Sequence, residues 1–576
     1  MTGIAWQGTV PAVSGQVVDR DTGVPLVTAV VEIRPVARAS DHFLPSGSAT
    51  AAMTDHAGRF MFADVAAGVF SLRASAFGYL ASDETSDYAS DVHKITVRQG
   101  QKLVGLSVPL QRPAAAVGVV RDESDRPVAD VEVLALRAKE IAGTLYVARR
   151  GSSSTRTDDR GEYHFSRLIP GDYVLAVPSF YQTLPRVFSH RRPTSSGLSK
   201  SGERAAESTF ALLGDQWVVS LAHGPVGPPL KLEGGGFSYA TTFVPSLPRV
   251  ARGDTLSLRS GEERTVDLHL NLSPEFRVSG ALVGPRGPLA ATEIQVTPEG
   301  LTGLVKDGLA TVATGTTDGN GRFMIAGVPV GRHALTVRTP GLSDMEPALW
   351  ARRVVDVVDG NLSDVDLMAK PMLMIRGRLE AHGTSPSQRK EAVAHQRITL
   401  ESMSGEPTVL TNADGEGTFV LRPSPGRYTL TVGSGGWHIR SIELGSRDVV
   451  DEPLQLQDDA EMTVTLSNDL TQVSGRVTDG TGAPARAQVV LFPRNRLLWA
   501  GYAASPWRLR STRTGSQGEY LFAALPPGDY LIAVVPAAMG ATWGALDNLD
   551  RLSATATGVA LREGDHYIQN LHLNSR

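Results

Sequence analysis

A short glycine–aromatic pattern occurs five times in this 576-residue chain and limits the fold more than any other feature. In each copy a glycine is followed two residues later by Phe or Tyr, and a second glycine comes nine or ten residues after the first. The first glycines of the five copies are Gly58, Gly161, Gly321, Gly417 and Gly518. Regular internal repetition of this kind predicts a tandem array of similar domains.

Each copy also has an opening glycine at a nearly constant distance upstream. The separation between the opening glycine and the first glycine of the pattern is 43, 43, 41, 40 and 43 residues in chain order. The opening glycines are Gly15, Gly118, Gly280, Gly377 and Gly475. Agreement at five places indicates one repeated structure rather than chance similarity.

The segments between these glycines have the composition of short strands and turns. Gln488–Leu491 is a β-branched run of strand length. The turn Thr157–Gly161 offers Asp side chains that accept hydrogen bonds from nearby backbone amides and a glycine that tolerates positive φ. Each repeat ends in two apolar stretches around a glycine, as in Val559–Leu573, which predicts a closing hairpin.

Short strands with frequent turns predict an all-β chain of five tandem antiparallel Greek-key β-sandwiches of immunoglobulin-like type, with no large helical domain. The predicted domains are 1–113, 114–274, 275–371, 372–468 and 469–576. The second is longer than the others, and we place the extra residues in a partly flexible insertion at about 182–239.

Composition excludes several classes of site. The chain has no cysteine, which excludes disulfides, thiol nucleophiles and thiolate metal sites. Its net charge of −4 gives no strong field for nucleic acid. The most apolar run, Leu531–Met539, is short and contains Pro536, so we expect no membrane span. Met1–Trp6 lacks the basic and apolar regions of a secretory leader.

Several motifs together resemble those of carboxypeptidase regulatory-like domains, which are prealbumin-like (transthyretin-like) β-sandwiches related to carbohydrate-binding-like folds. The motifs are the opening Val473–Gly475, the turn Thr157–Tyr163, the turn Leu525–Tyr530 and the closing segment Arg252–Leu256. The resemblance covers most of the chain except the insertion. It implies a non-catalytic module and, for tandem copies, a bacterial protein that is secreted, periplasmic or attached to the cell envelope.

No catalytic or metal motif accompanies the repeats. None of the 13 histidines has Glu three residues later, and there is no His-Glu-x-x-His, Gly-x-Ser-x-Gly or P-loop pattern. The Asp-rich turns lack the bidentate acid that a calcium loop needs. We therefore predict no enzyme activity, no catalytic residue, no cofactor and no metal.

The strongest candidate binding residues lie in a long loop of the fifth repeat. They are Trp499, Tyr502, Trp507, Arg508 and Arg510. Exposed rings there would stack on a sugar or on a partner protein, and the alternative is an aromatic cluster that closes the loop over the core. Weaker candidates are Tyr181, Trp217 and Trp437.

The sequence therefore predicts a structural, adhesive or spacer array outside the cytoplasm. Alternatives are a carbohydrate-binding protein and an accessory subunit of a separate peptidase. The predicted partners are a polysaccharide, other surface proteins, or further copies of the chain joined through edge strands, but not nucleic acid.

Overall fold

A computed structural model describes most of the chain. The described residues are 13–35, 49–63, 65–66, 68–84, 93–97, 102–141, 144–185, 209–213, 216–220, 236–246, 254–299, 311–341, 347–382, 386–403, 408–433, 437–467, 471–485, 487–501, 508–515, 517–523, 525–536, 543–544 and 546–573. Tyr502, Trp507 and much of the predicted insertion lie outside these ranges.

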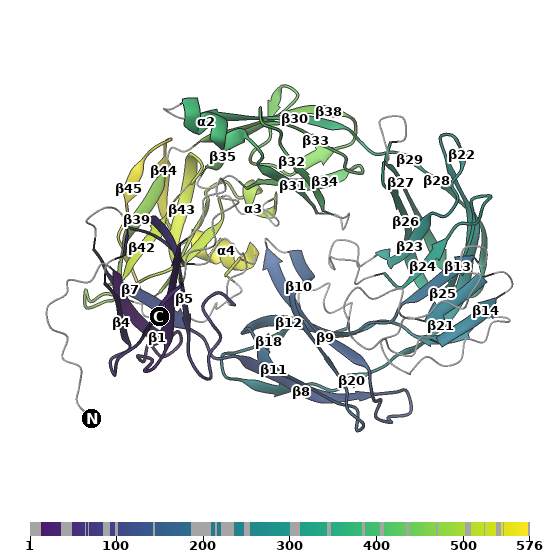
Figure 1. Cartoon of the computed structure of the whole chain (residues 1–576), viewed down its shortest axis with the longest axis horizontal. Helices are drawn as coiled ribbons and strands as arrows, with labels where there is room; N and C mark the ends of the chain where they lie inside the picture. The colour runs from purple at the N-terminus through teal and green to yellow at the C-terminus, as the bar shows by residue number, and fades with distance from the viewer. Residues whose placement is uncertain are drawn as a thin grey trace. The chain divides into compact units, whose positions relative to one another are not determined.

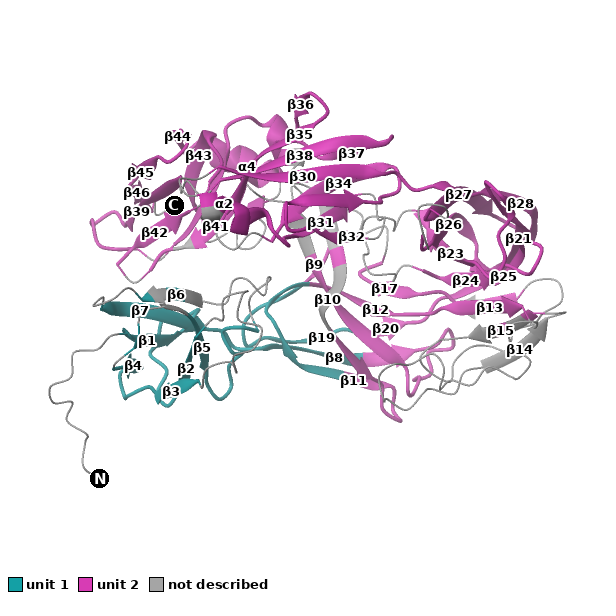
Figure 2. Cartoon of the chain, turned by 45° about the horizontal axis from the view of Figure 1, so that its top comes forward, with its two compact units in different colours: residues 1–118, 164–172, 257–267 teal, residues 119–163, 173–256, 268–576 magenta. Residues whose placement is uncertain are grey.

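The chain divides into two compact units, coloured separately in Figure 2. Unit 1 contains residues 1–118, 164–172 and 257–267, and unit 2 contains residues 119–163, 173–256 and 268–576. The boundary between the units therefore runs through the second repeat.

The first repeat, in unit 1, is a sandwich of two sheets with strand orders β4-β1-β7 and β3-β2-β5-β6 (Figure 1). The strands are β1 (Val13–Asp19), β2 (Val30–Pro35), β3 (Thr50–Met53), β4 (Arg59–Phe62), β5 (Gly68–Ser75), β6 (His93–Val97) and β7 (Leu103–Leu110). Alternate residues of these strands are buried, and Val17, Val31, Phe60 and Leu72 belong to one hydrophobic core.

The strands of the second repeat form two further sheets, of order β11-β8-β19 with β20 also on β8, and β10-β9-β12-β17 with β18 also on β12. They are β8 (Ala114–Arg121), β9 (Glu132–Ile141), β10 (Thr144–Arg156), β11 (Glu162–Leu168), β12 (Gly171–Val177), β17 (Thr242–Val244), β18 (Leu256–Leu258), β19 (Glu263–Thr265) and β20 (Leu268–His269).

The third repeat contains an eight-stranded sheet of order β14-β15-β13-β24-β23-β26-β27-β29 and a second sheet built around β21. Its own strands are β21 (Leu272–Gly284), β22 (Gly287–Pro288), β23 (Glu293–Pro298), β24 (Ala313–Thr316), β25 (Arg322–Pro329), β26 (Gly331–Thr339), β27 (Leu349–Val357), β28 (Leu362–Met368) and β29 (Lys370–Pro371).

The described parts of the predicted insertion add four strands to this third repeat. They are β13 (Tyr181–Pro185), β14 (Thr209–Leu213), β15 (Gln216–Ser220) and β16 (Gly236–Tyr239). β13 pairs in parallel with β24, and β16 pairs antiparallel with β21. The sequence places this segment in the second domain, because it lies between two strands of that repeat. In the structure its strands complete the sheets of the next repeat.

The fourth repeat has sheets of order β33-β30-β38-β35-β36 and β32-β31-β34-β37. Its elements are β30 (Ile375–His382), α2 (Pro386–Val393), β31 (Arg397–Ser402), β32 (Val409–Asn412), β33 (Thr418–Leu421), β34 (Gly426–Val432), β35 (His438–Leu444), β36 (Arg447–Asp448), β37 (Leu454–Leu456) and β38 (Ala460–Ser467).

The fifth repeat has sheets of order β42-β39-β45, with β46 also on β39, and β41-β40-β43-β44. Its elements are β39 (Gln472–Thr478), β40 (Gln488–Pro493), α3 (Leu497–Gly501), β41 (Arg510–Arg513), β42 (Glu519–Phe522), β43 (Gly528–Val535), α4 (Leu546–Ser553), β44 (Thr557–Leu561), β45 (His566–Ile568) and β46 (Leu571–His572). None of the helices in the described ranges has the length and hydrophobicity needed to cross a bilayer.

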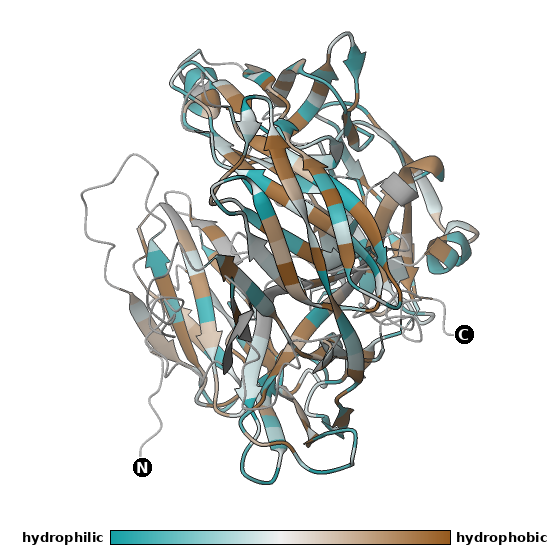
Figure 3. Cartoon of the chain, turned by 90° about the vertical axis from the view of Figure 1, so that its right-hand side faces the viewer, coloured by the Kyte–Doolittle hydropathy of each residue, from teal (hydrophilic) through white to brown (hydrophobic). Residues whose placement is uncertain are grey.

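The fold is all-β, with mostly antiparallel pairing, as the repeat pattern predicts. Figure 3 shows apolar and polar residues alternating along individual strands, as expected for sheets with one buried face. The closing segment differs from the predicted hairpin. In the fifth repeat β44 pairs antiparallel with β43, whereas β45 and β46 pair in parallel with β39. The closing segment therefore passes from one sheet to the other, which connects the last strand of a repeat to its first.

Candidate functional site

The Asp residue of the repeated turn binds the backbone of its own turn. In four repeats one carboxylate oxygen accepts two backbone N–H hydrogen bonds, from the residues two and four positions later, at 2.8–2.9 Å. These residues are Asp55, Asp158, Asp318 and Asp414. In the fifth repeat Gly515 takes the place of Asp, and the carboxylate of Glu519 accepts the Gln517 N–H at 2.8 Å instead. The Asp side chain therefore stabilises the backbone of the turn rather than binding a ligand.

A threonine hydroxyl, buried in the first three repeats, completes the turn in four repeats. Each hydroxyl donates to one carbonyl at 2.6–2.9 Å and accepts one backbone N–H at 2.8–2.9 Å across the loop. These residues are Thr54, Thr157, Thr317 and Thr514, and the fourth repeat has Ala413 in this place. Among the described residues, no group of three or more His, Asp or Glu side chains could hold a metal ion.

The structure shows why glycine occupies two places in the pattern. Gly161 has a φ of 73°, and a Cβ there would lie 2.9 Å from the backbone nitrogen of Val128. A Cβ on the opening Gly280 would lie 1.9 Å from the carbonyl oxygen of Val365 on the parallel closing strand. The repeated residues thus form the turns and allow the strands to approach closely.

In the candidate loop of the fifth repeat, Trp499 is buried. Its side chain packs edge-on against Phe492 with the ring centroids 5.6 Å apart, and Nε1 donates to the Pro493 carbonyl at 2.7 Å. Trp499 is 2% exposed and belongs to a second hydrophobic cluster that includes Leu549 and Leu552 of α4. The Trp499 ring therefore has no free face for a sugar in this conformation.

Arg508 is also buried, and it links the fourth repeat to the fifth. Its guanidinium donates to the carboxylate of Asp451, to the carbonyl of Pro527 and, at 3.0 Å, to the hydroxyl of Tyr530. Burial raises the pKa of Tyr530 to about 12. Arg510 is half-buried, and its guanidinium donates to the Ala523 carbonyl at 3.2 Å. Both arginines thus contact the protein's own backbone.

Of the three weaker candidates, two lie on neighbouring strands of the third repeat and the other lies in the fourth repeat. Tyr181 is 4% exposed and belongs to the core of the third repeat, while the half-buried Trp437 packs against the core of the fourth. Trp217 lies on β15, where its backbone pairs with Leu184 of β13. The structure does not bring these three residues together.

Unit 1 contains a polar cluster that the sequence did not reveal, centred on the turn Ala76–Tyr79. The Tyr79 hydroxyl donates to the buried Asp19 at 2.9 Å, and the Arg112 guanidinium lies 5.7 Å from the centroid of the Tyr79 ring. Burial by itself raises the pKa of Asp19, but hydrogen bonds from the Thr22 amide and the Tyr79 hydroxyl outweigh it, and the pKa is lowered.

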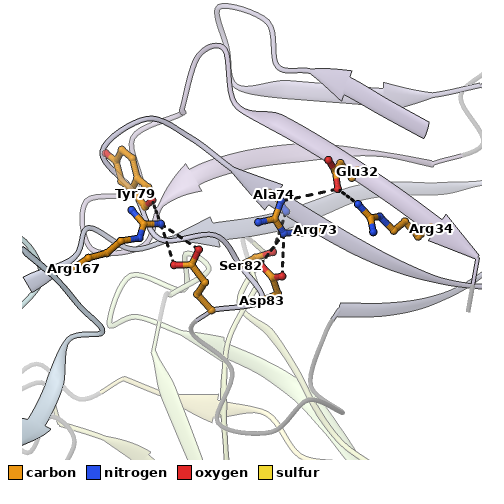
Figure 4. A network of polar contacts seen from close by, with 9 residues as sticks. Glu32, Arg34, Arg73, Ala74, Tyr79, Ser82, Asp83 and Arg167 are labelled. Carbon is orange, nitrogen blue, oxygen red and sulfur yellow. Dashed lines mark hydrogen bonds and ion pairs between the residues drawn. The ribbon is translucent and has the colours of Figure 1, made fainter. Parts of the chain in front are cut away.

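Arg167 of β11 closes this cluster from the second repeat (Figure 4). Its guanidinium donates to the Tyr79 carbonyl at 3.3 Å and to the Glu84 carboxylate at 3.0 Å. Nearby, Arg73 pairs with Asp83 at 2.9 Å. The sequence Ala-Phe-Gly-Tyr of this turn occurs once in the chain, so comparing the five repeats could not have found the cluster.

One family model matches the chain. Residues 12–111 match the carboxypeptidase regulatory-like domain, so the match covers the first repeat. This is the family that the sequence motifs resemble. No curated protein sequence matches the chain significantly.

Solved structures that the chain is similar to include two pilins and a putative carbohydrate-binding protein. The full-length major pilin RrgB from Streptococcus pneumoniae is 7% identical with a TM-score of 0.15, over 96% of this chain and 94% of that one. A streptococcal ancillary pilin is 12% identical with a TM-score of 0.18, over 52% and 100%. A putative carbohydrate-binding protein from Pseudomonas aeruginosa is 18% identical with a TM-score of 0.14, over 17% and 89%. Because these TM-scores are low, no functional conclusion follows from them.

Proposed function

We propose that this chain is a non-catalytic structural spacer that holds surface loops at a distance from a bacterial cell envelope. The observation that carries the proposal is that each repeat is bonded to the next by contacts beyond the covalent linker. Such contacts restrict the swinging that domains joined by a single linker otherwise show.

The four junctions use different contacts. Arg167 joins the second repeat to Glu84 of the first, within unit 1. Within unit 2, the Arg338 guanidinium of the third repeat donates to the Ser424 hydroxyl of the fourth at 3.4 Å. The fourth and fifth repeats share the Arg508–Asp451 pair and a 3.0 Å pair between Arg440 and Glu563.

The junction between the second and third repeats has the most chain crossings. Three short segments connect their sheets: 178–180, 240–241 and 270–271. Ser179 and Thr241 on the first two segments exchange two hydrogen bonds of 3.1 Å, and the Ala240 N–H donates to the Asn271 carbonyl at 3.3 Å. Three bonded crossings resist bending better than one.

Electron microscopy of the full chain tests the proposal. A compact domain of this size has a radius of gyration of about 13 Å, so five domains in line would reach on the order of 150–200 Å. We expect an elongated particle of one dominant shape, and more varied shapes for the double variant Arg167→Ala/Arg508→Ala. A compact globule for the unmodified chain would contradict the spacer function.

Location and partner follow as parts of the same proposal. We expect the protein in the extracellular or envelope fraction, with a polysaccharide, a surface protein or another copy of the chain as its partner. A glycan array with the full chain distinguishes the first partner from the others. Binding that survives Trp499→Ala would be assigned to residues other than this buried ring.

A further inference from the structure

We infer that the second and third repeats form one cooperative unit, because β13 acts as a strand donated by the second repeat to the core of the third. This inference does not depend on the spacer function, since it concerns how the chain folds and yields to force. It begins with the chain path. β12 ends at Val177 in a sheet of the second repeat, and β13 starts at Tyr181 in a sheet of the third.

β13 lies between strands of different origin. On one side it pairs in parallel with β24 of the third repeat, with Tyr181 opposite Ala313 and Thr183 opposite Gly315. On the other side it pairs antiparallel with β15, another strand of the insertion. Removing β13 would therefore expose the edge of β24 and detach β15 and β14 from the sheet.

The side chains of β13 fill a site in the third repeat that matches their shape. Gly327, on β25, has a φ of 75°, and a Cβ at this position would lie 2.5 Å from the Tyr181 ring. The Tyr181 ring thus packs against the backbone of Gly327, where any larger residue would clash with it. Tyr181 belongs to the same core cluster as Ile325 and Val328.

A buried hydrogen bond fixes the register of the donated strand. Thr183 is fully buried, and its hydroxyl accepts the Ala326 N–H of β25 at 3.1 Å. Because β24 and β25 lie in different sheets of the third repeat, Thr183 contacts both sheets of the sandwich. Loss of this strand would leave the Ala326 amide without its partner.

A second strand from the insertion binds the other sheet. β16 pairs antiparallel with the first part of β21, from Leu272 to Glu275. The insertion then returns to the second repeat, where Thr242 of β17 pairs with Val177 of β12. The third repeat thus receives strands in both of its sheets, and both ends of the insertion are held in the second repeat.

Stretching single molecules of the full chain tests this inference. If residues 114–371 yield together, they release about 90 nm of chain in one step. Independent repeats would instead give separate steps of about 55 nm and about 35 nm. We expect the single long step, and two separate steps for the unmodified chain would overturn the inference.

A matched pair of variants distinguishes coupling from general weakening. Tyr181→Ala removes the donated ring, and we expect it to split the long step into two. Tyr428→Ala removes a core tyrosine of the fourth repeat, and we expect it to weaken only the step of about 35 nm from that repeat. An undivided long step in Tyr181→Ala would contradict the role of this residue.

A disulfide keeps the test decisive where Tyr181→Ala fails to fold. Gln182 and Thr314 are opposite each other on β13 and β24, and the chain has no native cysteine. In the variant Gln182→Cys/Thr314→Cys, oxidation would enclose the loop between these residues and shorten the long step by about 45 nm, reversibly on reduction. Failure of the disulfide to form in the folded protein would overturn the strand donation.

Discussion

The Nε2 atom of His333 lies 2.8 Å from the carbonyl oxygen of Pro329, four residues earlier in the chain. Two other repeats place a tyrosine here: the Tyr428 hydroxyl donates to the Ser424 carbonyl at 2.8 Å, and the Tyr530 hydroxyl donates to the Pro526 carbonyl at 2.6 Å. The imidazole N–H therefore replaces a phenol in a corner that immunoglobulin-like sandwiches also use.

This replacement predicts a pH-dependent stability for the third repeat. Burial lowers the pKa of His333, although the bond to Pro329 favours the charged form. The unfolded chain binds a proton below about pH 6.5, whereas the folded chain resists it. The free energy of unfolding should fall as the pH drops below this value, by up to about 1.4 kcal/mol per pH unit.

Urea unfolding at pH 7.5 and pH 5.5 measures this effect of pH on the third repeat. His333→Tyr, which cannot titrate in this range, should be less sensitive to pH. Equal sensitivity in both proteins would assign the effect to other groups.

The buried threonine of the turn predicts a graded loss of stability. Thr317→Ala leaves the Thr292 N–H and the Leu289 carbonyl without the hydroxyl, so we expect a loss of about 1–3 kcal/mol in chemical denaturation. The fourth repeat already has Ala413 here, and Ala413→Thr is the matched reverse change. An unchanged midpoint for Thr317→Ala would mean that water replaces the hydroxyl.

The Arg508–Asp451 pair predicts a loss of rigidity at the last junction. Arg508→Ala removes the guanidinium that donates to Asp451, Pro527 and Tyr530. We expect the free energy of unfolding to fall by roughly 1–3 kcal/mol, since the Asp451 side chain is 35% exposed and partly screened. Proteolysis between the fourth and fifth repeats should become faster. Arg551→Ala, an exposed arginine on α4, is the control and should leave both measurements unchanged.

The Arg167–Glu84 pair predicts a weaker and salt-sensitive effect. Its side chains are 52% and 39% exposed, so Arg167→Ala should lower stability by less than about 1 kcal/mol at low salt. At about 1 M salt the Debye length falls to roughly 3 Å and the difference from the unmodified chain should vanish. A large loss that persists at high salt would show that the bond to the Tyr79 carbonyl dominates.

The buried Trp499 predicts a packing defect rather than a binding defect. Trp499→Ala should lower the free energy of unfolding by about 3–5 kcal/mol, because a large buried ring is lost next to Phe492. Thermal unfolding of the full chain checks this. A near-neutral effect would show that the ring is not needed to close the loop over the core.

Sequence patterns alone were enough to predict the repeat, the turn chemistry and the all-β class. These follow from local physics: Asp158 and Gly161 form their turn with neighbours a few residues away, and alternating apolar residues define strand faces wherever the strands finally pair. Turn residues and strand alternation are both contained in short segments of the chain, and the five copies therefore resemble one another despite their differences.

Strand pairing and the burial of particular aromatic rings could not be predicted in this way and became visible in the folded chain. The partner of Tyr181 is Ala313, far along the chain, and the burial of Trp499 depends on Leu549 and Leu552 of α4. Both outcomes depend on contacts between segments that no local pattern joins, because strand pairing and side-chain burial are decided by the whole fold.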